Sequence, residues 1–281
     1  MTDPAFTGLI RVRAYECDAF GHLNNAVYLQ YLQQVTLDAL GSDSGDGGFW
    51  DARGLSIEYR TPAIYGDELQ VAAWVIAVTE LVLLFGYRIM RLADHAPVAQ
   101  AEIEWSYRDP TTHALCRLPR NPLATPVFTS TAPLKPFVSP QDNGSKPFHW
   151  QHAVRFYELD ATKRVGLAVY FQWIQAAFFH ATGSVGWTLE KMRDENFVSL
   201  QYRHDAEFFG SAKNGDEIEI ASRLIEIRRV RGVWLHEIYR AATKELLLRD
   251  FSTGAFLDWK GNIRSGPMEI LGVLTRGEQL E

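Results

Sequence analysis

The stretch from Arg11 to Gln34 reads RVRAYECDAFGHLNNAVYLQYLQQ, and the rest of the chain follows its pattern. An alternating, strand-like segment over residues 11–15 is followed by a polar turn, and an amphipathic helix is predicted from Asn25. The turn, with Asp18 and His22, therefore precedes a helix N-terminus, where unpaired N–H groups favour an anion or a polarised carbonyl. A carboxylate beside such a site suits chemistry at a carbonyl carbon.

The same pattern returns from Val154 as VRFYELDATKRVGLAVYFQWIQ, without a gap, so that counterparts differ by 142 in number. A repeat this long predicts two copies of one domain rather than a solenoid of short repeats. The two turns differ, because Gly21-His22-Leu23-Asn24-Asn25 is replaced by Lys163-Arg164-Val165-Gly166-Leu167.

Composition narrows the class of protein. The chain has 281 residues, which is ample for two ordinary domains, and 47% are hydrophobic and 22% charged, as in a globular protein. The net charge of −6 gives no support for nucleic acid or an anionic membrane as the partner. The two cysteines, Cys17 and Cys116, form no metal-binding spacing and no disulfide framework. We find no secretion signal and no run long enough to span a bilayer, and we expect a cytoplasmic protein.

Periodicity predicts the same order of elements in each half. Helical spacing covers residues 25–40 and 167–182, with a short helical piece at 188–194. Strands are predicted at 55–60, 68–79, 81–91 and 98–107 in the first half, and at 198–208, 217–228, 233–240 and 246–258 in the second. A helix followed by an antiparallel sheet that wraps it is an α+β pattern.

A proline-rich stretch separates the halves. Seven prolines fall between Pro119 and Pro147, and they exclude a regular helix or a central strand there. We predict an N-terminal domain at 1–120 with the intact motif, a linker at 121–147, and a C-terminal domain at 148–281 with a degenerate motif.

The motif Glu16-x-Asp18-x-x-Gly21-His22-Leu23-Asn24-Asn25-x-x-Tyr28 resembles the signature of hotdog-fold thioesterases of the 4-hydroxybenzoyl-CoA thioesterase group, usually DxDxxGHxNNxxY. Glu16 departs from the usual first Asp, and the other positions match. The tandem arrangement also resembles double-hotdog acyl-ACP thioesterases. The resemblance implies two tandem hotdog domains, each an antiparallel sheet wrapped around a central helix, that pair within one chain as a pseudo-dimer with the active site at their interface. Further homo-oligomerisation is left open.

The resemblance places catalysis in the first turn. Asp18 matches the catalytic carboxylate of the family, as nucleophile or as general base for water, and the residues leave both roles open. His22 would orient water or protonate the leaving thiolate. The alternative interpretation is that His22 is a polar loop residue without a catalytic role. Asn24 and Asn25 would cap the helix or hold water or the thioester oxygen. The predicted substrate contacts of this copy are Gly21, Ala26 and Tyr28.

The second turn is predicted to be degenerate. Asp160 keeps the carboxylate position, but the residues around it have changed. Lys163 and Arg164 either pair with Asp160 or bind phosphates of coenzyme A or the acidic surface of a carrier protein. We therefore expect one competent site, centred on Asp18. The tryptophans Trp105, Trp173, Trp187 and Trp234 are interpreted as core residues in preference to acyl-channel lining.

The predicted function is hydrolysis of an acyl-CoA or acyl-carrier-protein thioester to acid and thiol, without a metal or other cofactor. Acyl-CoA is preferred, because the plant-type acyl-ACP enzymes carry the catalytic residues in their second copy. One rival is a hotdog hydratase or dehydratase, but its usual Asp and His spacing is longer than that of Asp18 and His22. The other rival is a non-catalytic binder of acyl thioesters, supported by the eroded second turn. The residues leave the acyl chain and the pathway open.

Overall fold

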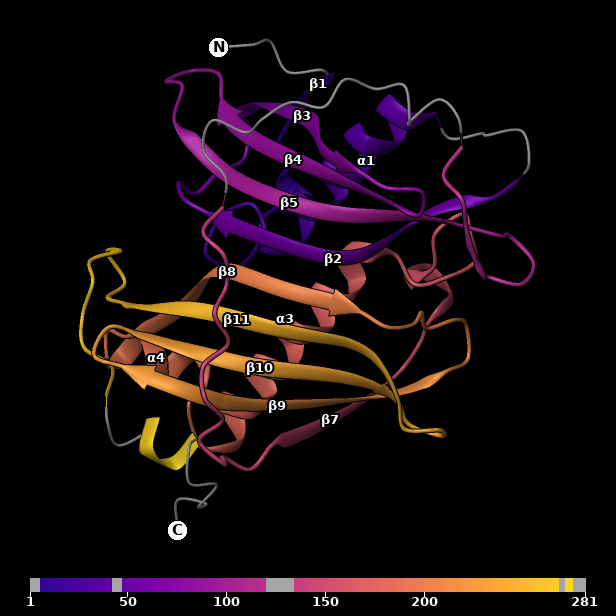
Figure 1. Ribbon diagram of the computed structural model, residues 1–281. Helices are drawn as coiled ribbons and strands as arrows, with labels where there is room; N and C mark the ends of the chain where they lie inside the picture. Colours follow the sequence, from indigo (N-terminus) through magenta and orange to yellow (C-terminus); the bar gives the residue numbers. More distant parts are fainter. Residues whose placement is uncertain (1–5, 42–46, 120–133, 268–270, 275–281) are drawn as a thin grey trace. The chain divides into compact units, whose positions relative to one another are not determined.

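The computed structural model describes residues 6–41, 47–119, 134–267 and 271–274 (Figure 1). The contacts between Cα atoms divide the chain into two compact units, Met1–Lys135 and Pro136–Glu281. The division falls within the predicted linker at 121–147, of which residues 121–133 lie outside the described part. The domain limits drawn from the sequence stay a prediction.

The first unit packs one long helix, α1 (Asn25–Leu40), against an antiparallel sheet. Along the sheet the strands follow the order β1 (Phe6–Arg11), β3 (Glu68–Val78), β4 (Val82–Arg91), β5 (Pro97–Arg108) and β2 (Phe49–Tyr59), and β6 (Leu115–Cys116) pairs with β5. Leu29 and Leu32 of α1 are fully buried, and each such leucine contributes about 2 kcal/mol to stability. The helix is therefore the core of its unit.

The second unit repeats this plan with α3 (Leu167–Ser184) and α4 (Leu189–Asp194). Its strands follow the order β8 (Val198–Phe208), β11 (Glu245–Leu257), β10 (Arg231–Arg240), β9 (Glu217–Arg228) and β7 (Phe148–Ala153), all antiparallel. The predicted α+β class and the wrapped helices are confirmed. Among the described helices, none is long and apolar enough to cross a membrane.

The predicted strand over residues 11–15 is wrong. β1 ends at Arg11, and Ala14–Glu16 form a 3-10 turn, η1. The reason is local: the Glu16 carboxylate accepts the Arg13 backbone N–H at 2.7 Å and so closes the turn. The second unit has the same turn, η2 (Phe156–Glu158), where Glu158 accepts the Arg155 N–H at 2.7 Å.

The pairing registers show how the two units correspond. In the first unit Phe85 pairs with Ile103, and in the second Trp234 pairs with Ser252, so counterparts in the strands after the helices differ by 149 in number. The bulged residues agree with this, since Ile76 is bulged in β3 and Ile225 in β9. The helices differ by 142, and the seven additional residues of the second unit lie between α3 and β8, where α4 is found.

Candidate active site

The turn after η1 is held in place by its own backbone. Asp18 donates its N–H to the His22 carbonyl at 2.8 Å, and Gly21 donates to the Asp18 carbonyl at 3.0 Å. Gly21 has φ 79°, in the left-handed region that glycine adopts without strain. His22 also bridges to Ile64 of the loop after β2, so the turn is anchored to a second loop of the unit.

The Asp18 carboxylate is half-buried and is positioned through one oxygen. Its Oδ1 accepts the N–H of Phe20 at 2.9 Å and the N–H of His22 at 3.4 Å. Both of these bonds within the turn use the same oxygen, so they fix the direction of the carboxyl group while Oδ2 lies outside them. In a carboxylate oriented in this way, Oδ2 can accept a proton from water or attack an electrophilic carbon.

Glu16 is a structural residue of the site that the sequence analysis missed. Its carboxylate is buried and accepts three hydrogen bonds, from the Arg13 N–H at 2.7 Å, the Arg13 guanidinium at 3.1 Å and the Tyr31 hydroxyl at 2.7 Å. Burial and the neighbouring carboxylate raise the pKa of Tyr31 well above its usual value, so the phenol stays a donor. Glu16 thus connects the turn before Asp18 to the helix after it.

The repeat was the signal that could have identified this role. In the second unit Glu158 accepts the Trp173 indole N–H at 2.9 Å and contacts His152 Nε2 at 2.9 Å. Trp173 is the counterpart of Tyr31. Glu16 and Glu158 thus make the same kind of contact in both copies, including the copy in which Gly21-His22-Leu23-Asn24-Asn25 is replaced, and this indicates a role in the fold.

The N-terminus of α1 is capped by Asn24, as predicted. Its side-chain oxygen accepts the N–H of Ala26 at 2.9 Å, so this N–H is already used by the cap. Ala26 is also buried, which argues against the predicted contact with substrate. Asn25 is the first helical residue, and its carbonyl accepts the Tyr59 hydroxyl at 2.9 Å. The cap therefore uses the side chain of Asn24 and does not require the side chain of Asn25.

Tyr28 makes a structural contact within the first unit, and its contact with substrate stays a prediction. It is 2% exposed, and its hydroxyl accepts the Ala63 N–H at 3.3 Å. Burial raises the pKa of Tyr28 to about 12. Tyr170, its counterpart in the second unit, accepts the Ala212 N–H at 2.8 Å in the same way. In both units this contact fixes the helix to the loop beside the turn.

The second turn keeps the backbone of the first but has a different carboxylate environment. Asp160 donates its N–H to the Arg164 carbonyl at 2.8 Å, and Lys163 takes the place of Gly21 with φ 63°. Asp160 Oδ1 accepts the Thr162 N–H at 2.8 Å and the Thr162 hydroxyl at 2.5 Å. The second turn thus has a hydroxyl donor to this oxygen that Phe20 cannot supply in the first turn. Lys163 is exposed and Arg164 is buried.

A second polar cluster lies on the helix-facing side of the sheet of the second unit. His236 is fully buried between the hydroxyls of Ser222, at 2.8 Å, and Ser252, at 3.1 Å. His204 Nδ1 lies 2.9 Å from the carboxylate of Asp250, which is also fully buried. Burial lowers the pKa of His236 to about 3 and raises that of Asp250. Over the described ranges, no three His, Cys, Asp or Glu side chains gather as metal ligands.

The chain is similar to known thioesterases in sequence and in fold. Residues 12–130 match the thioesterase-like superfamily, a range that covers the first turn, α1 and the strands from β2 to β6. The first unit is therefore similar to this superfamily over most of its length. The chain is 32% identical over 72 residues to the long-chain acyl-CoA thioesterase FadM of Escherichia coli, a match that covers 23% of this chain and 53% of that protein. It is 28% identical over 100 residues to a chloroplastic acyl-acyl carrier protein thioesterase of Arabidopsis thaliana, covering 33% of this chain and 53% of that one. The match thus spans about half the length of these relatives.

Solved structures extend the likeness to both units. A protein described as an oleoyl thioesterase from Lactobacillus plantarum aligns with a TM-score of 0.73 and 16% identity, over 91% of this chain and 98% of that one. The 12:0-ACP thioesterase from Umbellularia californica aligns with a TM-score of 0.67 and 13% identity, over 89% and 93%. At these identities the likeness establishes the fold alone, and that fold is a tandem hotdog.

Proposed function

We propose that the protein is an acyl thioesterase, which hydrolyses an acyl thioester to a free acid and a thiol. The observation that carries this proposal is the Asp18 carboxylate, held by the Phe20 and His22 N–H groups just before the N-terminus of α1. The superfamily of residues 12–130 supports the reaction class. The site requires no redox or metal chemistry, because attack on a thioester needs a base or nucleophile and a place for the negative charge of the carbonyl oxygen.

Two routes are open to Asp18. As a general base it takes a proton from water, the water oxygen attacks the thioester carbon, and the carbon–sulfur bond breaks to release the thiolate. As a nucleophile it attacks the carbon directly, releases the thiolate, and leaves a mixed anhydride that water then hydrolyses. In both routes the thiolate gains one proton, and His22, on the same turn, is the proposed donor.

The helix N-terminus would stabilise the developing oxyanion. The α1 dipole favours negative charge at this end. Because the Ala26 N–H is bonded to Asn24, the proposed contact to the oxygen comes from the side chain or N–H of Asn25. Gly21 adds a surface without a side chain, and nothing lies within 4 Å of where its Cβ would be. Backbone and substrate can therefore approach closely there.

The substrate proposed is an acyl-CoA, with an acyl-carrier protein as the second possibility. FadM, to which the chain is 32% identical over 72 residues, is a long-chain acyl-CoA thioesterase. The exposed ammonium of Lys163 is the proposed contact for phosphate or for an acidic carrier surface. The pairing of the two units within one chain, with one competent turn and one degenerate turn, is part of this proposal.

A non-catalytic binder of acyl thioesters is the second candidate. The Thr162 hydroxyl bound to Asp160 favours it for the second turn, because this extra hydrogen bond occupies an oxygen of the carboxylate. The first turn has no such hydroxyl at Phe20, so we assign catalysis to Asp18.

The test is thiol release from acyl-CoA and acyl-carrier-protein substrates, with Asp18→Asn and Asp160→Asn as a matched pair. Asparagine retains the oxygen that accepts the N–H groups, so each variant should keep its turn. We expect Asp18→Asn to lower kcat by about 10²–10⁴-fold and Asp160→Asn to leave it within about twofold. Equal losses would mean two working sites. Tight binding without thiol release in the wild type would favour the binder.

A further inference from the structure

A tyrosine at the end of β2 reaches the first turn of α1. Tyr59 is the last residue of β2, and its hydroxyl donates to the Asn25 carbonyl at 2.9 Å. Its ring packs edge-to-face against Tyr28, one helical turn further along, with the ring centroids 5.2 Å apart. Tyr59 therefore contacts the beginning of the helix in two ways, through an apolar ring contact and through one hydrogen bond.

The hydrogen bond holds one end of a particular peptide group. The Asn25 carbonyl and the Ala26 N–H belong to the same planar peptide unit. Asn24 Oδ1 accepts the Ala26 N–H at 2.9 Å, and the Tyr59 hydroxyl donates to the carbonyl. The plane is thus held from both sides, by the turn that precedes the helix and by the strand beside it. Because the Cα of Asn25 is part of this plane, the direction of its side chain is restrained as well.

The loop after β2 holds the preceding turn at two further places. Ile64 forms a β-bridge with His22. The Ala63 carbonyl accepts the Leu23 N–H at 2.8 Å. Both contacts are made by the backbone, so they do not depend on which side chains the turn carries.

The second unit repeats these backbone contacts. Arg164 forms the corresponding bridge with Lys213, and the Ala212 carbonyl accepts the Val165 N–H at 3.1 Å. The backbone of the turn is therefore positioned in the same way in both units. The difference between the two helix N-termini lies in the side chains.

The tyrosine hydroxyl is one group that the second unit lacks. Phe208 ends β8 as Tyr59 ends β2, and both hold the same position in the pairing register. The Phe208 ring contacts Tyr170 edge-on, with the centroids 5.8 Å apart. The ring contact is therefore common to both units and belongs to the fold. The hydroxyl is confined to the unit whose turn we propose to be competent.

The start of the second helix also lacks the other groups. Gly166 is the N-cap of α3 and brings no side chain, and Leu167, which replaces Asn25, is 7% exposed. The side-chain cap of Asn24, the amide of Asn25 and the hydroxyl of Tyr59 are thus present together in one unit and absent together from the other. This is expected if the three groups serve one task.

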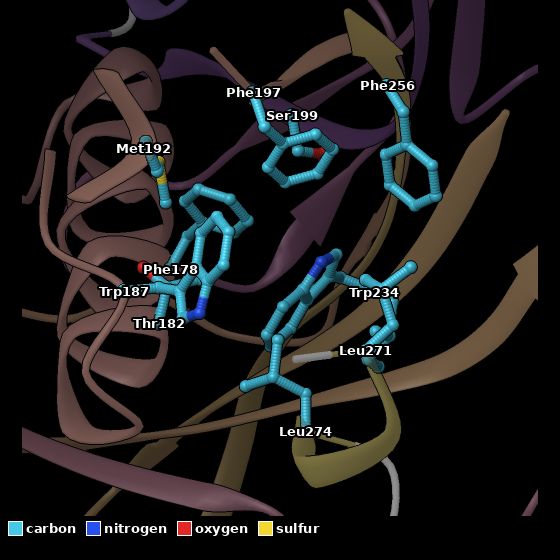
Figure 2. Close-up of a pocket in the computed structure, with 11 residues that line it drawn as sticks. Phe178, Thr182, Trp187, Met192, Phe197, Ser199, Trp234, Phe256, Leu271 and Leu274 are labelled. Atoms are coloured by element: carbon cyan, nitrogen blue, oxygen red, sulfur yellow. The ribbon is translucent and has the colours of Figure 1, made fainter. Parts of the chain in front are cut away.

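The units also differ in the other half of the helix, at a distance from this contact. Figure 2 shows Phe178 and Trp187 of the second unit facing Trp234 of β10 around an apolar pocket. Trp187 and Trp234, which we predicted to be core residues, are both buried. Phe178 lies in the C-terminal half of α3, whereas Phe208 contacts Tyr170 near the N-terminus. The missing hydroxyl is therefore a separate difference between the units.

We propose that Tyr59 is a positioning residue of the thioesterase site, which directs the side-chain amide of Asn25 toward the carbonyl oxygen of the thioester. The inference rests on the proposed function, which assigns the contact with that oxygen to Asn25. It selects the side chain of Asn25 as the donor, because Leu167 retains a backbone N–H at this position and lacks the amide. Tyr59 acts through Asn25, and its hydroxyl orders the donor before the substrate binds.

A double-mutant cycle of Tyr59→Phe and Asn25→Ala, measured by thiol release, tests this role. Tyr59→Phe removes the hydroxyl and leaves the ring, as at Phe208, so the unit should fold. We expect kcat to fall about five- to tenfold, as for the loss of one hydrogen bond, with KM within about twofold of the wild type. In the Asn25→Ala background the same substitution should change kcat by less than about twofold, because the amide is gone.

The cycle separates positioning from a purely structural role. Asn25→Ala retains the backbone carbonyl, so a structural bond from Tyr59 would cause the same loss of kcat in both backgrounds. Equal losses, or an effect on KM alone, overturn the proposal. Phe208→Tyr is the matched control, which should leave kcat within about twofold because Leu167 has no amide to position. A loss of kcat in Phe208→Tyr as large as in Tyr59→Phe also overturns the proposal.

Hydrogen exchange of the Ala26 amide, followed by NMR, reports on the same peptide group without turnover. Tyr59→Phe should accelerate this exchange about fivefold or more, because one of the two bonds that hold the peptide is lost. No acceleration overturns the proposal. If Asp18→Asn abolishes thiol release but Tyr59→Phe leaves kcat unchanged, the proposed function stands and this inference fails. If the wild type releases no thiol, the proposed function fails and the positioning role with it, whatever the exchange rate.

Discussion

Substitution of Glu16 tests whether its hydrogen bonds hold the turn that contains Asp18 in position. Glu16→Ala removes the acceptor of two buried hydrogen bonds, from the Arg13 N–H and the Tyr31 hydroxyl. Hydrogen bonds to a charged partner contribute about 1.5–3 kcal/mol each, so we expect the loss of both to cost about 3–6 kcal/mol. The ion pair with Arg13, whose side chain is 58% exposed, adds less than about 1 kcal/mol because solvent screens it.

Glu16→Gln is the conservative variant, because its amide oxygen still accepts one of the two bonds. We expect it to cost about 1–2 kcal/mol, since the charge is lost and the shape is kept. The free energy of unfolding is measured by urea denaturation, followed by circular dichroism. As a positioning residue, Glu16 should also affect kcat more than KM, and Glu16→Gln should restore part of the kcat lost in Glu16→Ala.

Glu158→Ala is the matched control in the second unit. It removes the corresponding bonds to Arg155 and Trp173 and should cost a similar free energy. Its kcat per folded molecule should remain near that of the wild type, because it supports the turn of Asp160. The reasoning is refuted if Glu16→Ala unfolds at the same urea concentration as the wild type, or if the two alanine variants lower kcat equally.

Other predictions concern backbone strain and pH. Gly21→Ala should lower the free energy of unfolding by about 1 kcal/mol, because φ 79° disfavours a side chain even though the space is open. Lys163→Gly should raise it by a similar amount, since Lys163 has φ 63°. Urea denaturation measures both changes. His236 has a folded pKa of about 3, below its unfolded value, so its contribution to stability is present above about pH 6.5 and is lost as the pH falls toward 3. We expect a loss of about 2 kcal/mol between pH 7 and 5. The raised pKa of Asp250 acts in the opposite sense. Its contribution to stability is lost as the pH rises above the pKa that Asp250 has in the unfolded chain. His236→Gln should therefore flatten or reverse the fall in stability below pH 6.5, and an unchanged profile would contradict this assignment.

Local patterns were sufficient for most of the fold. The helical spacing from Asn25 and from Leu167, and the strands after each helix, follow from hydrophobic periodicity and turn residues within a few positions of one another. The error at residues 11–15 arose because alternation there competes with a side-chain contact: Glu16 bonds to the Arg13 N–H and turns the chain. That competition is visible only once the side chain is placed.

The candidate site also contains some residues that the sequence brings together and others whose roles depend on tertiary contacts. Asp18, Gly21, His22 and Asn24 lie within one continuous turn, so their order along the chain already brings them together. Glu16 acts through Tyr31, on the next element, and Tyr28 acts through Ala63 on a distant loop. The roles of Glu16 and Tyr28 therefore required the positions of their partners.

The sequence alone was sufficient to predict the repeat, the wrapped helices and the turn of Asp18, because each depends on residues close together in the chain. Tertiary structure was needed to see how the two cores differ in packing. Ser199 and Gly254, which stand where the first unit has Trp50 and Trp105, come from two strands that antiparallel pairing brings together. Their counterparts could not be read from the ungapped repeat, because the α4 insertion changes the offset from 142 to 149. Whether a position in a core is filled or hollow depends on which side chains meet there across strands, and that is a property of packing.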